Sequence, residues 1–103
     1  MTPTVLTLLR PGEVGKLLAD RVKTLRLGGG LTRRTLALRA GVTASSLKRF
    51  ETTGKASLEL VLKVAAALGR LDEFVELLAP PPVGSIAELE RRAAKPVPKR
   101  GRI

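Results

Sequence analysis

The stretch RRTLALRAGVTASSLKRFET, residues 33–52, decides the fold, because its residue types meet the constraints of two short helices joined by a tight turn. Ala37 supplies the small side chain that two crossing helices need at their contact, and Gly41 tolerates the positive φ that such a turn requires. The positions that should face inward are all apolar, namely Leu36, Ala40, Val42, Leu47 and Phe50. The complete register predicts a helix-turn-helix motif.

Helical periodicity and capping residues place further helices around this motif. Thr32, Thr43 and Ser57 are good N-caps, and the glycines at 28–30 are expected to end a helix, since no GK[ST] sequence of a phosphate loop follows them. The segment after Ser57 has almost no polar face, which predicts that it is the central, buried helix. We expect helices at 13–27, 33–40, 44–51, 58–68 and, from Leu71, Phe74, Val75 and Leu78, at 71–78.

Composition changes mark three regions of the 103-residue chain. We expect an N-terminal arm at 1–12, a five-helix domain at 13–79 and an extension at 80–103. The extension opens with three prolines, continues with a capping-box sequence (SIAE) for a short helix that reaches about residue 94, and ends in the basic tail KPVPKRGRI. The predicted fold class is therefore all-α, with a C-terminal extension.

The absence of two residue types from the sequence excludes several classes of chemistry. The chain has no Cys and no His, which excludes thiol catalysis, disulfides, the usual zinc sites and histidine acid–base chemistry. We expect no catalytic residues, no metal and no cofactor, and hence no enzyme. The sequence shows neither a bilayer-spanning apolar run nor a secretory leader, so we expect a cytoplasmic, nucleoid-associated protein with no membrane partner.

The charge of the chain is strongly basic and unevenly distributed. The formal net charge is +10, and residues 16–55 alone hold ten basic and two acidic residues. Residues 56–79 hold two basic and four acidic residues, so this part is mildly acidic. One cationic side beside a mildly acidic one is typical of a domain that faces a polyanion.

The sequence LTRRTLALRAGVTASSLKRFETTGKASLELVLKVAAALG (31–69) resembles the XRE family of phage-repressor-like helix-turn-helix domains, and the resemblance covers about residues 13–78. It implies a five-helix, lambda-repressor-like fold whose third helix enters the major groove of DNA. It implies base reading by Thr43, Ala44, Ser45, Ser46 and Arg49. It implies contacts to DNA phosphates by Arg26, Thr32, Arg33, Arg34, Lys48, Thr52, Thr53 and Lys55. It also implies an ion pair between Arg26 and Glu51 within the domain.

The function that we predict is sequence-specific transcriptional regulation, as a repressor that binds a palindromic operator on double-stranded DNA as a homodimer. A finer similarity to HipB-like antitoxins rests on KRFETTGKASLE and the Pro-rich extension, and implies an antitoxin that represses its own operon and holds a toxin partner. Three alternatives remain open at this point. These are a phage-type regulator without a toxin, an interaction module that inhibits a partner, and an RNA-binding protein.

Overall fold

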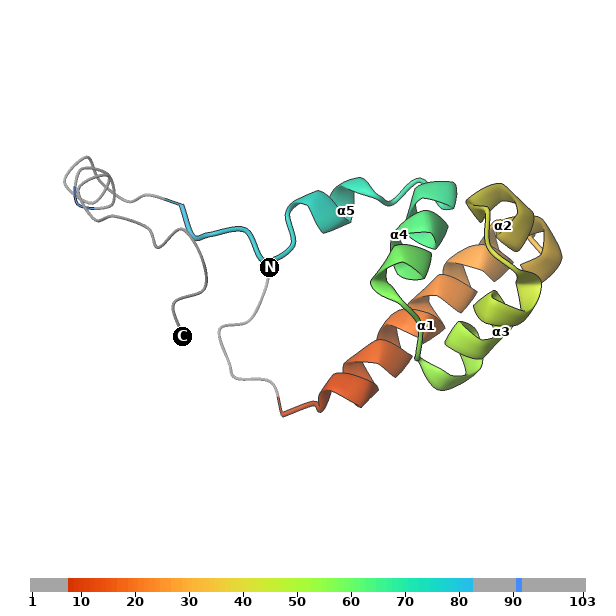
Figure 1. The fold of residues 1–103 in the computed structure, drawn as a ribbon, viewed down its shortest axis with the longest axis horizontal. Coiled ribbons are helices and arrows are strands. Elements are labelled where there is room, and N and C mark those ends of the chain that lie inside the picture. The colour runs from red at the N-terminus through yellow and green to blue at the C-terminus, as the bar shows by residue number, and fades with distance from the viewer. Residues whose placement is uncertain (1–7, 83–90, 92–103) are drawn as a thin grey trace.

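The computed structural model describes residues 8–82 and Arg91, and this part of the chain is all-helical (Figure 1). The helices are α1 (Pro11–Gly28), α2 (Arg33–Ala40), α3 (Ala44–Thr53), α4 (Leu58–Ala67) and α5 (Asp72–Val75). Of the predicted arm at 1–12, residues 1–7 lie outside the described residues, and residues 11 and 12 belong to α1. The predicted short helix up to about residue 94 and the basic tail also lie outside them, apart from Arg91.

Capping side chains begin the helices at the predicted places. The hydroxyls of Thr32, Thr43 and Ser57 each accept a hydrogen bond from the backbone N–H three residues later, at 3.0, 3.1 and 3.1 Å. Pro11 is the first residue of α1, where its missing N–H costs nothing, and the Glu13 carboxylate accepts a bond from the Arg10 backbone N–H. Helix α1 therefore begins two residues earlier than the sequence predicted.

The core lies where α3 packs against α1 and α2, and where α2 packs against α4. The largest fully buried side chains are Leu36, Leu47, Phe50 and Val64. Leu36, Leu47 and Phe50 belong to the inward set that the sequence predicted, while Ala40 and Val42 are partly buried against the same cluster. The helix-turn-helix thus contributes the centre of the core as well as a surface.

Helix α1 packs through small residues as well as through large apolar ones, of which Leu18 and Val22 lie against the core. Ala19 is fully buried, whereas Val14 and Leu17 remain 37% and 38% exposed. A Cβ placed on Gly15 would lie 2.7 Å from the carbonyl oxygen of Gly54, the residue that ends α3. Small residues on α1 therefore allow its backbone to approach the end of α3 closely.

Helix α4 is not the central, buried helix that its composition predicted. Only Leu60, Val64 and Ala65 are buried in it, and Leu58 is 67% exposed. In a domain of this size α4 is covered by neighbours on one side only, so the apolar residues of its other side stay in contact with water.

Helix α5 is a single turn, shorter than the predicted 71–78. The three prolines at 80–82 have no backbone N–H to donate to the carbonyls of residues 76–78, so the helix cannot continue toward them. Leu78 has a positive φ of 59° and is 96% exposed, and Leu71 and Val75 are also exposed. Only Phe74 packs partly inward, so little burial supports a longer helix.

Candidate nucleic-acid interface

The turn between α2 and α3 fixes the direction of α3. Gly41 ends α2 with a φ of 74°, a conformation that L side chains rarely adopt, and the backbone N–H of Val42 donates to the Ala37 carbonyl at 3.0 Å. Ala37 is buried at the contact of the two helices. This confirms the role that the sequence assigned to Ala37 and Gly41.

One side of α3 is buried and the other presents the predicted base-reading residues to solvent. Leu47 and Phe50 hold α3 in the core. The five residues assigned to base reading are all exposed, namely Thr43, Ala44, Ser45, Ser46 and Arg49. Among the described residues, no side-chain hydrogen bond or ion pair involves the Arg49 guanidinium. Its N–H donors are therefore free for an acceptor outside the protein.

The hydroxyls at the start of α3 are already partly engaged. Thr43 accepts from the Ser46 backbone N–H and donates its own proton to the Ser46 Oγ at 2.7 Å, while its oxygen lies 3.3 Å from that of Ser45. Ser46 keeps its hydroxyl proton for an external acceptor. Thr43 is thus better placed to fix the rotamer of Ser46 than to read a base itself.

The residues predicted to touch phosphates form three groups. Arg26 and Arg33 pair with Glu51, and Arg26 is buried there with its guanidinium fully engaged, so its predicted phosphate contact is wrong. The threonines donate their hydroxyl protons inside the protein: Thr32 to the Thr35 hydroxyl, Thr52 to the carbonyls of Lys48 and Arg49, and Thr53 to the Arg49 carbonyl. The exposed cations, by contrast, have no ion-pair partner in the described part of the chain, and they are Arg34, Lys48 and Lys55. The cations are the side chains that can meet a phosphate, and the threonines mainly cap helix ends.

The predicted ion pair between Arg26 and Glu51 is present and buried, and it has a third member. Arg26 donates from Nε to Glu51 Oε2 at 2.8 Å and from Nη2 to Oε1 at 3.0 Å. Arg33 donates from Nε to the same Oε1 at 2.9 Å. The sequence reasoning missed the pairing of Arg33 with Glu51, and the only signal for it was a second arginine at the first residue of the helix that faces Glu51.

The electrostatics of this cluster keep Glu51 charged. Burial alone would raise the pKa of the Glu51 carboxyl, but hydrogen bonds and charges from Arg26 and Arg33 outweigh the burial and hold that pKa below its ordinary value of 4.5. No buried side-chain nitrogen or oxygen lacks a hydrogen-bond partner in the described residues. The buried charge is therefore fully compensated, as a stable core requires.

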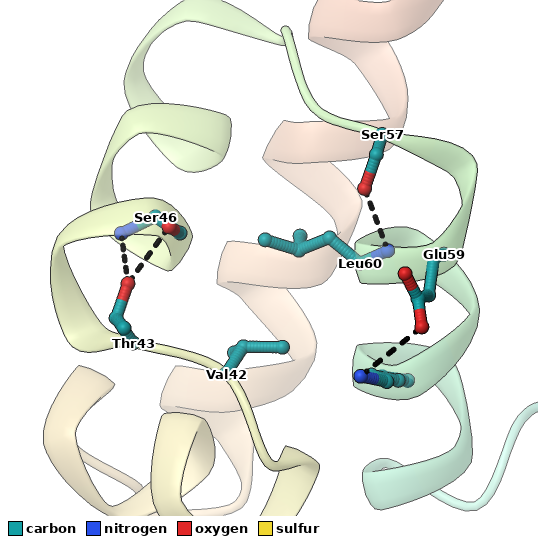
Figure 2. A pocket seen from close by; sticks show the side chains of 7 residues that line it. Val42, Thr43, Ser46, Ser57, Glu59 and Leu60 are labelled. Carbon is teal, nitrogen blue, oxygen red and sulfur yellow. Dashed lines mark hydrogen bonds and ion pairs between the residues drawn. The ribbon is translucent and has the colours of Figure 1, made fainter.

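A polar groove of about 220 Å³ runs beside α3, between its first turn and the first turns of α4 (Figure 2). Ser46 lines it on the α3 side, and Ser57 and the ion pair of Lys63 with Glu59 line it on the α4 side. The groove is smaller than the cavities of about 300–1,000 Å³ that usually bind small molecules. It adds polar groups from the start of α4 to the α3 surface, and the sequence had indicated no role for Glu59 or Lys63.

A second, apolar surface lies on the other side of the domain. Figure 1 shows α5 beyond α4, at the end away from α2 and α3. A cavity of about 350 Å³ there is lined by Val14 and Leu18 of α1, Glu73 and Phe74 of α5, and Leu77. Leu8, Leu9, Leu17, Leu71, Val75, Leu77 and Leu78 are large apolar residues of α1, α5 and their flanks that are at least one-third exposed.

Within the described residues no group of three His, Cys, Asp or Glu could hold a metal ion. The described helices are all too short or too polar to cross a membrane. A family model described as helix-turn-helix matches residues 22–74, just over half of the chain. No curated protein matches the chain.

Proposed function

The chain belongs to the helix-turn-helix family and is a DNA-binding transcriptional regulator, and we propose that it is a repressor which reads a palindromic operator as a homodimer. The observation that carries this proposal is the solvent-facing side of α3. There Arg49 has a free guanidinium, and Ser45 and Ser46 lie one helical turn before it.

In the proposed complex, α3 lies in the major groove. The Arg49 guanidinium can donate two hydrogen bonds to the O6 and N7 of one guanine, which is the commonest specific contact in this groove. Ser46 is held by Thr43 and donates its remaining proton to a base edge. The exposed cations Arg34, Lys48 and Lys55 surround this face and would contact the two phosphate strands, which sets the position of α3 without reading sequence.

A dimer follows from the small number of base contacts that one domain can make. Few side chains of α3 face outward, so one domain alone would discriminate weakly among sequences. Two domains would place their α3 helices one DNA turn apart, about 34 Å. The apolar surface of α1 and α5 supports dimerisation, because exposed apolar patches of this kind mark contacts with other proteins.

We further propose that the protein acts as the antitoxin of a toxin–antitoxin operon and represses its own promoter. This proposal rests on the similarity of KRFETTGKASLE and the Pro-rich extension to HipB-like antitoxins. A toxin has to be held away from α3 and from the dimer surface, and we propose the basic tail KPVPKRGRI as the segment that holds it. A phage-type repressor without a toxin uses the same α3 surface, and the neighbouring gene distinguishes the two.

Selection of binding sites from a random duplex library tests the main proposal. We expect a palindrome whose half-sites lie one turn apart. Arg49→Ala should lower the discrimination at one base pair per half-site by about 1–3 kcal/mol. A library that returns no consensus, or tighter binding to structured RNA than to duplex DNA at the same salt concentration, would overturn the proposal.

A further inference from the structure

The cluster of Arg26, Arg33 and Glu51 joins three elements and holds two cations around one anion. Glu51 projects from α3 with a side chain that has no exposed surface, Arg26 comes from the last turns of α1, and Arg33 is the first residue of α2. Glu51 Oε1 accepts from both arginines, at 3.0 and 2.9 Å. The cluster therefore keeps one positive charge that Glu51 does not neutralise.

The two arginines differ in how much of their hydrogen-bonding capacity the protein uses. Arg26 has a side chain only 7% exposed, and it donates from Nε and Nη2 to Glu51 and from Nη1 to the Leu31 carbonyl. Arg33 has a side chain 31% exposed and donates only through Nε in the described part of the chain. Since no buried side-chain nitrogen there is unbonded, both Nη groups of Arg33 face solvent. The net positive charge of the cluster is therefore exposed to solvent at the Arg33 guanidinium.

We propose that Glu51 is a positioning residue for DNA binding: it holds Arg33 by its Nε edge, so that the two Nη groups face a backbone phosphate at the start of α2. This inference rests on the proposed function and adds the device that prepares one of its phosphate contacts. An arginine side chain that is free in solution loses rotamer entropy when it binds a phosphate. The fold has already restricted Arg33, so less entropy remains to be lost.

The neighbouring hydroxyl cannot take this role. Thr32 accepts from the Thr35 backbone N–H and donates to the Thr35 hydroxyl, so its only proton is used within the cap. A lysine at position 33 would not serve either. Its compact ammonium group lacks the separate, fixed edges with which the planar guanidinium can hold Glu51 on one side and a phosphate on the other.

The opposite reading is that Glu51 competes with DNA for Arg33. In that case Arg33 would have to leave Glu51 before it reached a phosphate, and removal of the carboxylate charge would strengthen DNA binding. The two readings predict effects of opposite sign, which makes them separable.

The first experiment compares Arg33→Lys with Arg39→Lys on duplex DNA over a series of salt concentrations. Arg39 lies on the same helix, is exposed and makes no hydrogen bond or ion pair with the cluster, so it is the matched control. We expect Arg33→Lys to weaken binding about tenfold while leaving the salt slope unchanged, and Arg39→Lys to stay within about twofold of the wild type. We expect Arg33→Ala to weaken binding and also to lower the salt slope by about one unit.

The second experiment is a double-mutant cycle in DNA affinity with Glu51→Gln and Arg33→Ala, measured at a temperature where circular dichroism shows all variants folded. Glu51→Gln should weaken binding in the wild type and have no further effect in the Arg33→Ala background. An effect of equal size in both backgrounds, or tighter binding by Glu51→Gln, would overturn the inference.

The outcomes also separate this inference from the proposed function. A wild-type protein that binds no duplex DNA at low salt refutes the proposed function. A wild-type protein that binds, with Arg33→Lys indistinguishable from Arg39→Lys, refutes only the positioning role of Glu51. If Glu51→Gln does not fold, the comparison of the two lysine variants still decides.

Discussion

Phe50 and Phe74 are the only two aromatic residues of the chain. They lie in two regions that differ in how fully the apolar side chains are buried. Phe50 is 2% exposed and packs with Leu36 and Leu47 in the core beneath the α3 surface. Phe74 is only half-buried, and it lines a cavity of about 350 Å³ between α1 and α5. Leu36, Leu47 and Phe50 are buried within the chain, whereas the α1–α5 region leaves apolar side chains exposed. We propose that the second protomer of the dimer covers them.

Because of this difference, we expect substitutions in the two regions to change different quantities. A substitution in the first region should act on the free energy of unfolding, because every contact there is within the chain. A substitution in the second should act on the monomer–dimer equilibrium, because the side chains there have open space on one side.

Truncation of the two phenylalanines makes the largest contrast. Phe50→Ala should lower the free energy of unfolding by about 3–5 kcal/mol, since it leaves a cavity in a closed core. Phe74→Ala should cost about 1 kcal/mol in the monomer, because the ring is half in water already. Urea denaturation at a protein concentration low enough to keep the chain monomeric measures both values. Equal losses would remove the distinction between the two regions.

The second-largest effect on the free energy of unfolding is expected at the glycine contact between α1 and the end of α3. Gly15→Ala places a methyl group 2.7 Å from the Gly54 carbonyl oxygen, and neither backbone can move without shifting a helix. We expect a loss of about 1–3 kcal/mol in unfolding free energy. Gly12→Ala is the matched control on the same helix, since a Cβ there meets nothing within 4 Å, and should stabilise the protein by up to about 1 kcal/mol. Thermal melts of the two variants should therefore shift in opposite directions.

A charge placed on the α1–α5 surface tests its role in association. Val75 is 74% exposed on α5, so Val75→Asp should leave the monomer's unfolding free energy within about 0.5 kcal/mol of the wild type. We expect it to weaken the dimer about tenfold or more, as seen by sedimentation velocity without DNA. Leu27→Asp, at an exposed leucine at the other end of α1, is the control and should leave the dimer intact. A dimer that tolerates Val75→Asp lies on another surface.

The smallest effect is expected from acid, and it belongs to the helix-turn-helix region. The pKa of Glu51 is lowered in the folded protein, mainly because Arg26 and Arg33 outweigh the burial that would raise it. Its contribution to stability is therefore present above its ordinary pKa of 4.5 and lost as the pH falls through the lower folded value, where the unfolded chain binds more protons. Denaturation at a series of pH values should show the difference between wild type and Glu51→Gln shrinking below pH 4.5. A difference that does not change with pH would show that Glu51 contributes without its charge.

A feature could be predicted from the sequence when its physical cause lies in residues that are neighbours in the chain. Helix α2 was predicted with both ends correct, because Thr32 caps one end and Gly41 ends the other. The close approach of α1 to the end of α3 was not predicted, because Gly15 and Ala19 carry too little apolar surface to stand out in the helical periodicity. Periodicity reports which residues avoid water, and it says nothing of how closely two backbones can approach.

The features of the candidate site also divide into those with a local cause and those that depend on the fold. The exposure of Ser45, Ser46 and Arg49 follows from the burial of Leu47 and Phe50 on the opposite side of one helix. The pairing of Arg33 with Glu51 joins residues 18 positions apart and depends on the angle between α2 and α3. The roles of these residues on DNA remain predictions, which the variants above test.

The contact of Gly15 with Gly54 has a consequence for how this sequence can change over generations. A side chain at either position meets backbone atoms of the other segment, at 2.7 Å from position 15 and at 2.6 Å from position 54. The two positions are therefore expected to change together in evolution, although 38 residues separate them in the chain. A lineage that replaces one glycine is expected to reshape the loop after α3, and this would alter the segment that holds Lys55, one of the cations that we propose as phosphate contacts.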